Sequence, residues 1–151
     1  MRFTIDSNIL VYAADADTPA KHDIARDILL RAEDADSVLT VQALGEFLSV
    51  IGRKYPIHLE AARGQAKRWV AIFPLLDTTA EHILSAADFA SRYRLQFWDS
   101  LIWQVARSAD ATLFLSEDLQ DGLSLEGMTV INPFIPENGD RLEALLAGGR
   151  D

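Results

Sequence analysis

Residues 2–10 read RFTIDSNIL, and this stretch sets the pattern for the whole chain. The run 2–5 predicts a first β-strand, and the apolar spacing of residues 7–14 predicts a short helix directly after it. Asp6 stands between the two, at the carboxyl end of the strand. The chain therefore opens with a strand, a carboxylate and a helix, in that order.

Short apolar runs alternate with longer helical patterns along the rest of the chain. Further strands are predicted at residues 37–41, 73–76, 112–115 and 128–131, and helices at 19–32, about 42–54, 59–72, 79–93, about 99–109 and 140–146. This alternation predicts one α/β domain over residues 1–151, with a mostly parallel central sheet of four to five strands flanked by helices on both faces. Residues from about 136 to 151 are expected to form a C-terminal helix and tail.

Composition and charge narrow the classes of function. The chain has 151 residues, is 49% hydrophobic and contains no cysteine, which excludes disulfides, thiolate catalysis and Cys-ligated zinc. The formal charge of −9 argues against a general nucleic-acid coat, which would be basic. The negative charge suits a basic protein partner, or it serves solubility alone. No signal peptide or membrane span is evident, so we expect a cytoplasmic protein with no membrane contact.

Four acids occupy matching places beside the predicted strands. Asp6 follows the first strand, and Asp118 comes three residues after the strand at 112–115. Glu46 lies about one turn into the helix after the second strand, and Asp99 lies in the opening turn of its helix. Sheets of this type bind ligands outside the carboxyl ends of their strands. If the sheet is parallel, all four acids converge on that edge.

Such convergence is unfavourable unless a cation neutralises it, because carboxylates a few ångströms apart repel each other. Mg²⁺ takes oxygen ligands and substrate phosphates, and it can activate a water molecule for attack on a phosphodiester. The pattern thus predicts metal-assisted phosphodiester hydrolysis. Taken singly, Asp6 and Asp99 could only cap helices, Glu46 could be a solvated helix residue, and Asp118 could belong to a turn.

Five segments resemble the motifs of a known family. The segments DSNIL (6–10), ALGEF (43–47), WDSLI (98–102) and LSEDLQDG (115–122) resemble the four acidic motifs of PIN domains, in order and over nearly the whole chain. The ending INPF (131–134) is similar to that of bacterial VapC-like toxins. The sequence therefore resembles the PIN-domain family, and within it the VapC-like toxin ribonucleases of type II toxin–antitoxin systems.

The resemblance implies a PIN-like fold and an endoribonuclease that depends on Mg²⁺, with Mn²⁺ as a possible substitute. It also implies a VapB-like antitoxin as partner and a homodimer. By analogy, the residues that bind metal and catalyse are Asp6, Glu46, Asp99 and Asp118. The residues that surround them and orient carboxylates or waters are Ser7, Asn8, Ser116, Glu117 and Asp121. Glu117 and Asp121 lie close enough to Asp118 in sequence that either could share its role.

Basic and aromatic residues give weaker indications. Arg92 and Arg94 precede Asp99, so we expect them to hold RNA phosphates. A second basic cluster, residues 53–68, is interpreted as solvated helix surface. Tryptophan can stack on bases or fill an interface. We expect Trp98, at a loop–helix junction, to serve an interface, and the other two tryptophans to lie in the core.

Two other classes of protein remain open. A PIN-like fold could bind RNA or protein without catalysis, although none of the four motif acids is missing. An acidic-pocket phosphotransfer protein is the third class. A phosphatase with an aspartate nucleophile needs a second aspartate at position 8, where this chain has Asn8. That class also uses a lysine beyond the later strands, and this chain has no lysine after Lys67.

Overall fold

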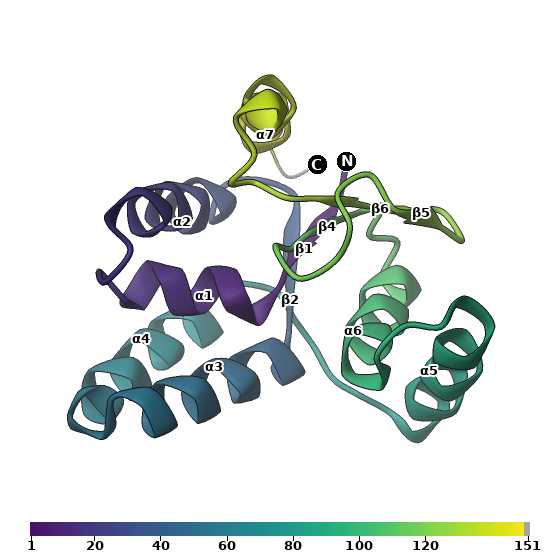
Figure 1. The fold of residues 1–151 in the computed structure, drawn as a ribbon, viewed down its shortest axis with the longest axis horizontal. Coiled ribbons are helices and arrows are strands. Elements are labelled where there is room, and N and C mark those ends of the chain that lie inside the picture. The colour runs from purple at the N-terminus through teal and green to yellow at the C-terminus, as the bar shows by residue number, and fades with distance from the viewer. Residues whose placement is uncertain (150–151) are drawn as a thin grey trace.

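The carboxyl ends of five parallel strands form one edge of the sheet in the computed structural model, which describes residues 1–149. The sheet has six strands in the order β3-β2-β1-β4-β6-β5 (Figure 1). The strands are β1 (Phe3–Ile5), β2 (Ser37–Thr40), β3 (Leu75–Leu76), β4 (Leu113–Leu115), β5 (Ser124–Leu125) and β6 (Met128–Ile131). The predicted class is confirmed, but the sheet is larger than the four to five strands expected.

The additional strand is β5, which pairs antiparallel with β6. Glu126 and Gly127 form the two-residue loop between them, with φ values of 47° and 86°. Two successive positive φ values are the mark of a tight hairpin turn. Because β5 has only two residues, it leaves no alternating pattern that a sequence can reveal.

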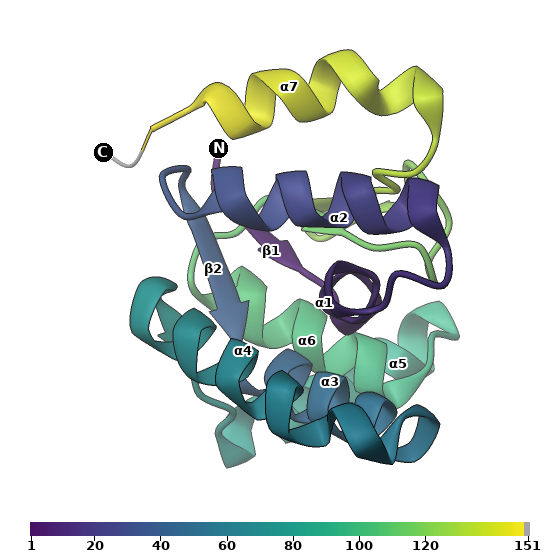
Figure 2. The same ribbon diagram turned by 90° about the vertical axis from the view of Figure 1, so that its left-hand side faces the viewer.

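Helices cover both faces of the sheet (Figure 1). One face carries α1 (Ser7–Ala14), α2 (Pro19–Ala32), α3 (Val41–Lys54) and α4 (Leu59–Ile72), while the other carries α5 (Ala80–Tyr93) and α6 (Phe97–Ser108). The helix α7 (Gly139–Ala147) lies along α2, to which Arg31 and Glu143 join it by an ion pair of 2.8 Å (Figure 2). Two short 3₁₀ turns, η1 (Pro56–His58) and η2 (Pro136–Asn138), precede α4 and α7. The last two residues of the predicted tail, 150–151, lie outside the described residues.

Successive side chains of a strand point to opposite faces of the sheet, so the hydrophobic core has one part on each face. Phe3 and Ile5 face the helices α1–α4, whereas Phe114 faces α5 and α6, where it contacts Trp103 edge-on at 6.0 Å. The residues of β1, β2, β4 and β6 are nearly all buried, as expected of a parallel sheet covered on both sides, whereas the edge strands β3 and β5 have no buried residue. None of the helices within residues 1–149 has the length and hydropathy that crossing a bilayer requires.

The strand order places a topological switch between β1 and β4. From β1 the chain adds β2 and then β3 on one side, and it later adds β4 and β6 on the other. Ile5 and Leu115 are partners in the register, so Asp6 and Ser116 emerge side by side at the carboxyl ends of these strands. Crevices at such switch points are the usual ligand sites of open parallel sheets.

Candidate active site

Asp6 lies at the centre of this edge and is only 2% exposed. Its carboxylate caps α1 by accepting a hydrogen bond from the Ser7 amide at 2.8 Å. It also accepts hydrogen bonds from the Ser116 hydroxyl at 2.7 Å and from the Asn8 side chain at 3.3 Å. The Ser116 hydroxyl oxygen in turn accepts a hydrogen bond from the backbone amide of Asp118 at 3.2 Å. One serine therefore connects the acids that follow β1 and β4.

Glu46 lies in the second turn of α3. This helix is capped at its N-terminus by Thr40, whose hydroxyl oxygen accepts a hydrogen bond from the Ala43 backbone amide. The two carboxylate oxygens of Glu46 are held separately. The Ser7 hydroxyl donates to one at 2.7 Å, and the Gln42 side chain donates to the other at 2.7 Å. Ser7 thus contacts Glu46, and the orienting role expected of Ser7 stays a prediction.

Asp99 and Asp118 are held less tightly than the other two acids. Within residues 1–149, neither side chain accepts a hydrogen bond or forms an ion pair. Asp99 lies in the first turn of α6, where an acid is favourable near the positive end of the helix dipole. Asp118 is exposed in the loop after β4. These two carboxylates therefore keep their oxygens available for a ligand.

Burial and mutual repulsion shift the pKa values of this group. Burial raises the pKa of Asp6 to about 7, although the hydrogen bond from Ser116 lowers it. The negative charges of Asp99 and Asp118 add to the rise. Burial likewise raises the pKa of Asp99 to about 6, with contributions from the charges of Asp118 and Glu46. Asp6 and Asp99 are therefore the two carboxyl groups whose pKa values respond to the charges of neighbouring acids in this group.

The four acids line a single cavity of about 600 Å³ between α3, α6 and the strand ends. The four acids therefore meet, as the sequence predicts, in the sense that they line the same cavity. Within residues 1–149, however, no three His, Cys, Asp or Glu side chains are grouped tightly enough to hold a metal ion by themselves. The other lining residues are Ser7, Gln42, Gly45, Ser49, Val50, Arg53, Gln96 and Trp98.

The donor set of this cavity fits a hard divalent cation. Mg²⁺ usually binds through one or two carboxylates, substrate phosphates and several waters rather than a closed protein cage. Two side-chain acceptors near the acids, Asn8 Oδ1 and Gln42 Oε1, are buried and accept no hydrogen bond within the described part of the chain. Acceptors of this kind suit water molecules that donate from the coordination sphere of an ion.

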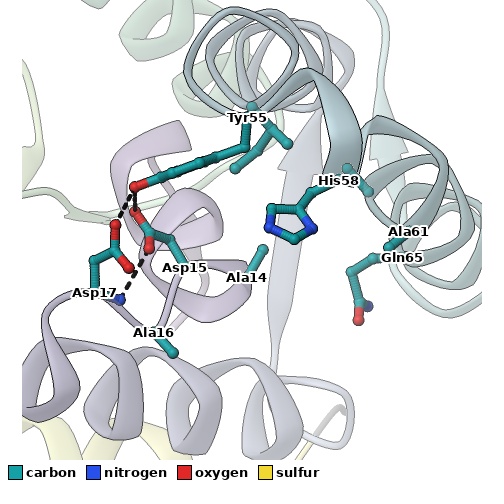
Figure 3. Close-up of a pocket in the computed structure, with 10 residues that line it drawn as sticks. Ala14, Asp15, Ala16, Asp17, Tyr55, His58, Ala61 and Gln65 are labelled. Carbon is teal, nitrogen blue, oxygen red and sulfur yellow. Dashed lines mark hydrogen bonds between the residues drawn. The ribbon is translucent and has the colours of Figure 1, made fainter.

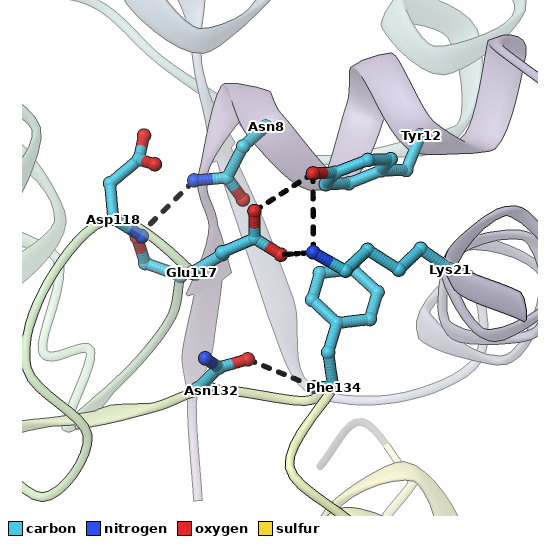
Figure 4. A network of polar contacts seen from close by, with 8 residues as sticks. Asn8, Tyr12, Lys21, Glu117, Asp118, Asn132 and Phe134 are labelled. Carbon is cyan, nitrogen blue, oxygen red and sulfur yellow. Dashed lines mark hydrogen bonds and ion pairs between the residues drawn. The ribbon is translucent and has the colours of Figure 1, made fainter. Parts of the chain in front are cut away.

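Glu117 and Asp121, the two neighbours that compete with Asp118 in sequence, are occupied elsewhere. Glu117 accepts hydrogen bonds from the Tyr12 hydroxyl at 2.8 Å and from Lys21 at 2.6 Å (Figure 4). The Asp121 carboxylate accepts hydrogen bonds from the backbone amide of Asn132 and from the side-chain amide of Asn138, both at 2.9 Å. Of the three motif acids, the structure thus places Asp118 at the cavity.

Neither of the arginines predicted to hold RNA lines the acid cavity, and their RNA-binding role stays a prediction. Arg92 pairs with Glu126 at 3.1 Å, and Arg94 is the exposed, left-handed C-cap of α5 with φ 56°. The cation that lines the cavity is Arg53, at the end of α3. Its spacing from Gln42 and Glu46 on one helix face is the signal that sequence reasoning left unused.

A second cavity, of about 450 Å³, lies where the ends of α1 and α3 approach α4 (Figure 3). The Tyr55 hydroxyl donates to the carboxylates of Asp15 and Asp17 at its rim. The hydrogen bond to Asp17 raises the pKa of Tyr55 to about 12. None of the four motif acids lines this cavity, so it is separate from the candidate active site.

Comparison with models of known protein families shows which family this chain belongs to. The family model described as PIN domain matches residues 3–120, which include the four acids. The chain belongs to the PIN-domain family. A comparison of this PIN domain with curated protein sequences finds no significant match.

Solved structures resemble this PIN domain at low sequence identity. The Mycobacterium tuberculosis toxin VapC20, described as sarcin-ricin loop cleaving, has 17% identity and a TM-score of 0.63 over 74% of this chain and 86% of its own. A chain of the VapBC2 complex of Rickettsia felis, bound to a promoter DNA fragment, has 14% identity and a TM-score of 0.62. The match covers 87% of this chain and 98% of the Rickettsia chain. The Pyrobaculum aerophilum protein PAE2754 has 16% identity and a TM-score of 0.63, over 95% of this chain and 96% of its own. At these identities the likeness establishes a shared fold.

Proposed function

We propose that this PIN domain is a metal-dependent endoribonuclease and acts as the toxin of a VapBC-like toxin–antitoxin pair in the cytoplasm. The observation that carries the proposal is the meeting of Asp6, Glu46, Asp99 and Asp118 at one cavity, on the switch-point edge of the sheet. The fold shared with a toxin described as cleaving the sarcin-ricin loop supports RNA as the substrate.

In this proposal the four acids hold Mg²⁺, or Mn²⁺ in its place. When bound, the ion supplies an activated water and stabilises negative charge on the phosphodiester. Ser7 and Gln42 fix the two oxygens of Glu46, while Ser116 and the Ser7 amide fix Asp6. Because Asp6 has a pKa of about 7, it must give up its proton for the site to bind a cation, and the positive charge favours that loss.

Cleavage of RNA tests the enzymatic part of the proposal. Purified protein should cut structured RNA with Mg²⁺ and stop cutting in EDTA. Asp99→Asn should lower the rate by at least about 100-fold while the far-UV circular dichroism stays unchanged. Asp23→Asn is the matched control, because Asp23 is an exposed acid on α2 and lies outside the cavity. Full activity in Asp99→Asn would refute the assignment, and RNA binding without cleavage by the wild-type protein would favour a non-catalytic module.

The toxin role and the partner have a separate test. Several of the structures with this fold are toxin–antitoxin complexes, and a formal charge of −9 suits a basic partner. Expression of the wild-type chain should arrest bacterial growth, whereas Asp99→Asn should not. A short reading frame next to the gene should relieve the arrest when co-expressed. Growth that is unaffected by the active chain would contradict the toxin role.

We also propose that the chain is a homodimer. Sedimentation equilibrium should then give twice the chain mass of 16.7 kDa. A monomer at micromolar concentration would contradict this part, and it would leave the ribonuclease assignment standing.

A further inference from the structure

Two walls of the acid cavity belong to helices on opposite faces of the sheet. α3 carries Glu46 and lies on one face, whereas α6 carries Asp99 and lies on the other (Figure 1). Both carboxylates line the same cavity, so their like charges repel each other and act to separate the two helices. A site that uses both acids for one ligand therefore needs a contact that holds α3 and α6 together.

Gln42 makes a contact of this kind. It lies in the first turn of α3, which follows β2 without a loop, so its side chain starts at the carboxyl edge of the sheet. The side-chain Nε2 donates one hydrogen bond to Glu46 Oε1 at 2.7 Å and another to the backbone carbonyl of Trp98 at 2.9 Å. Within residues 1–149, the hydrogen bond to Trp98 is the only one that joins α3 to α6.

The two partners fix the orientation of the Gln42 amide. A carboxylate and a carbonyl oxygen only accept hydrogen bonds, and the side-chain NH₂ group has two hydrogens, one for each of them. The hydrogen bond to Glu46 is charge-assisted, which makes it stronger than one between neutral groups. If the amide nitrogen and oxygen were exchanged, an acceptor would face two acceptors. Only the observed orientation therefore satisfies these contacts.

The start of α6 depends on this contact because it has no capping side chain. Its N-cap residue, Gln96, makes no side-chain capping hydrogen bond. The Trp98 side chain is 56% exposed and does not anchor the turn, whereas Trp69 and Trp103 are 3% and 0% exposed and lie in the core, as the sequence predicts. The Trp98 carbonyl belongs to the peptide group that links Trp98 to Asp99. The hydrogen bond to this carbonyl therefore acts on the backbone directly beside the acid.

We propose that Gln42 is a positioning residue that joins α3 to α6 and thereby sets the separation of the Glu46 and Asp99 carboxylates. The inference rests on the proposed function, because it gives Gln42 a part in holding the divalent ion. An amide is neutral, so it fixes the acids without cancelling the negative charge that attracts a cation. Removal of groups that orient metal-binding side chains commonly weakens metal affinity by about 10–100-fold.

The affinity for Mn²⁺, measured by titration calorimetry on the full chain without RNA, tests the first part of the inference. Gln42→Met keeps the length and helix propensity of the side chain and removes both donors. It should raise the Kd for Mn²⁺ about tenfold or more. Gln65→Met is the matched control, because Gln65 is a partly exposed glutamine on α4 and does not line the acid cavity. The control should bind Mn²⁺ as the wild type does.

Amide hydrogen exchange in EDTA tests the connection between the helices, without metal or substrate. The Ser100 amide donates to the Gln96 carbonyl at 3.0 Å in the first turn of α6. Gln42→Met should speed the exchange of amides 100–102 about tenfold and leave that of amides 84–90, in the middle of α5, unchanged. A general loss of stability would instead speed exchange in both segments, and it would overturn the positioning role.

Cleavage of RNA with Mg²⁺ adds a kinetic readout. Gln42→Met should lower kcat about tenfold or more and leave KM for RNA nearly unchanged, because the amide contacts the acids and not the substrate. A rise of KM at normal kcat would mean that Gln42 contacts the RNA, and it would contradict a positioning role.

The inference requires both weaker Mn²⁺ binding and faster exchange at the start of α6, so the absence of either effect in Gln42→Met overturns it. If the wild type cleaves RNA and Gln42→Met shows neither effect, this inference fails and the ribonuclease assignment stands. If the wild type does not cleave RNA and Gln42→Met shows both effects, the ribonuclease assignment fails and the positioning role of Gln42 stands.

Discussion

Asp6 shows how one buried carboxyl group connects stability to function. It is 2% exposed, and burial raises its pKa to about 7, against about 3.9 in an unfolded chain. The folded state therefore holds this proton more strongly than the unfolded state does. The contribution of the group to stability is fully present below pH 4 and is lost as the pH rises towards 7.

The Asp6→Asn variant should remove this dependence. In EDTA, the free energy of unfolding of the wild type should fall relative to that of the variant between pH 4 and pH 7, by a few kcal/mol in total. Urea denaturation at pH 5 and pH 8 measures the difference, with Asp23→Asn as the exposed control. If wild type and Asp6→Asn lose stability in parallel, Asp6 does not carry the shifted pKa.

Gly45→Ala should affect stability and binding in opposite directions. Alanine in the interior of α3 should raise the free energy of unfolding by about 0.5–1 kcal/mol. The added methyl group enters the acid cavity, so RNA affinity should fall. Gly64→Ala on α4 is the matched control, because its Cβ also meets nothing within 4 Å and Gly64 lies outside the cavity. Weaker RNA binding by the Gly64 variant to the same degree would contradict this account of Gly45.

The single-residue features of the site differ in how far the sequence reveals them. The four acids could be named because each stands in a fixed place beside a strand end or a helix start. The contact of Ser7 with Glu46 joins residues 39 positions apart, so no local pattern shows it. Arg53 and Trp98 share a cavity only because of how α3 and α6 pack. The prediction for Arg92 and Arg94 used nearness in sequence to Asp99, but neither arginine lines the cavity, since α5 ends at a left-handed C-cap, Arg94, before α6 begins.

Among the elements, the loop after β4 depends on a contact with α1 and α2. Glu117 accepts hydrogen bonds from Tyr12 and Lys21, and the Lys21 ammonium lies 5.1 Å from the Tyr12 ring centre and 5.4 Å from that of Phe134 (Figure 4). The next residue is Asp118. This polar cluster therefore fixes the segment that carries the fourth acid.

Lys21→Met should separate a positioning role from a structural one. Because Lys21 and Glu117 are partly exposed, the loss of stability should be about 1 kcal/mol or less. Displacement of Asp118 should lower kcat about tenfold or more and leave KM for RNA nearly unchanged. Lys21→Arg should restore much of the rate, and Lys67→Met on the exposed face of α4 should have no effect. Normal kcat in Lys21→Met would show that the cluster does not position Asp118.

Element types were predictable where the pattern was strong, and element ends were not. Val41 looks like the last residue of a strand, but the Thr40 cap makes it the first residue of α3. The predicted strand at 73–76 shortens to Leu75–Leu76, because Phe73 is the C-cap of α4 and Pro74 has no amide to pair. In each case a local capping interaction outweighs the apolar run.

For the molecule as a whole, the acid cavity concentrates part of a formal charge of −9 at the edge formed by the carboxyl ends of the parallel strands. Mg²⁺ that binds there stabilises only the folded state, so it should raise Tm in proportion to the logarithm of its concentration above Kd. Thermal unfolding with 0 and about 10 mM Mg²⁺ tests this for wild type and Asp99→Asn. Equal rises of Tm in both proteins would mean that the ion binds elsewhere.

The most direct test of the shared ion is a crystal of the wild-type protein grown with Mn²⁺ and measured at the manganese absorption edge. The account predicts an anomalous peak in the cavity lined by Asp6, Glu46, Asp99 and Asp118, and loss of the peak in Asp99→Asn. A protein that cleaves RNA with Mn²⁺ but shows its manganese outside this cavity would contradict the central claim.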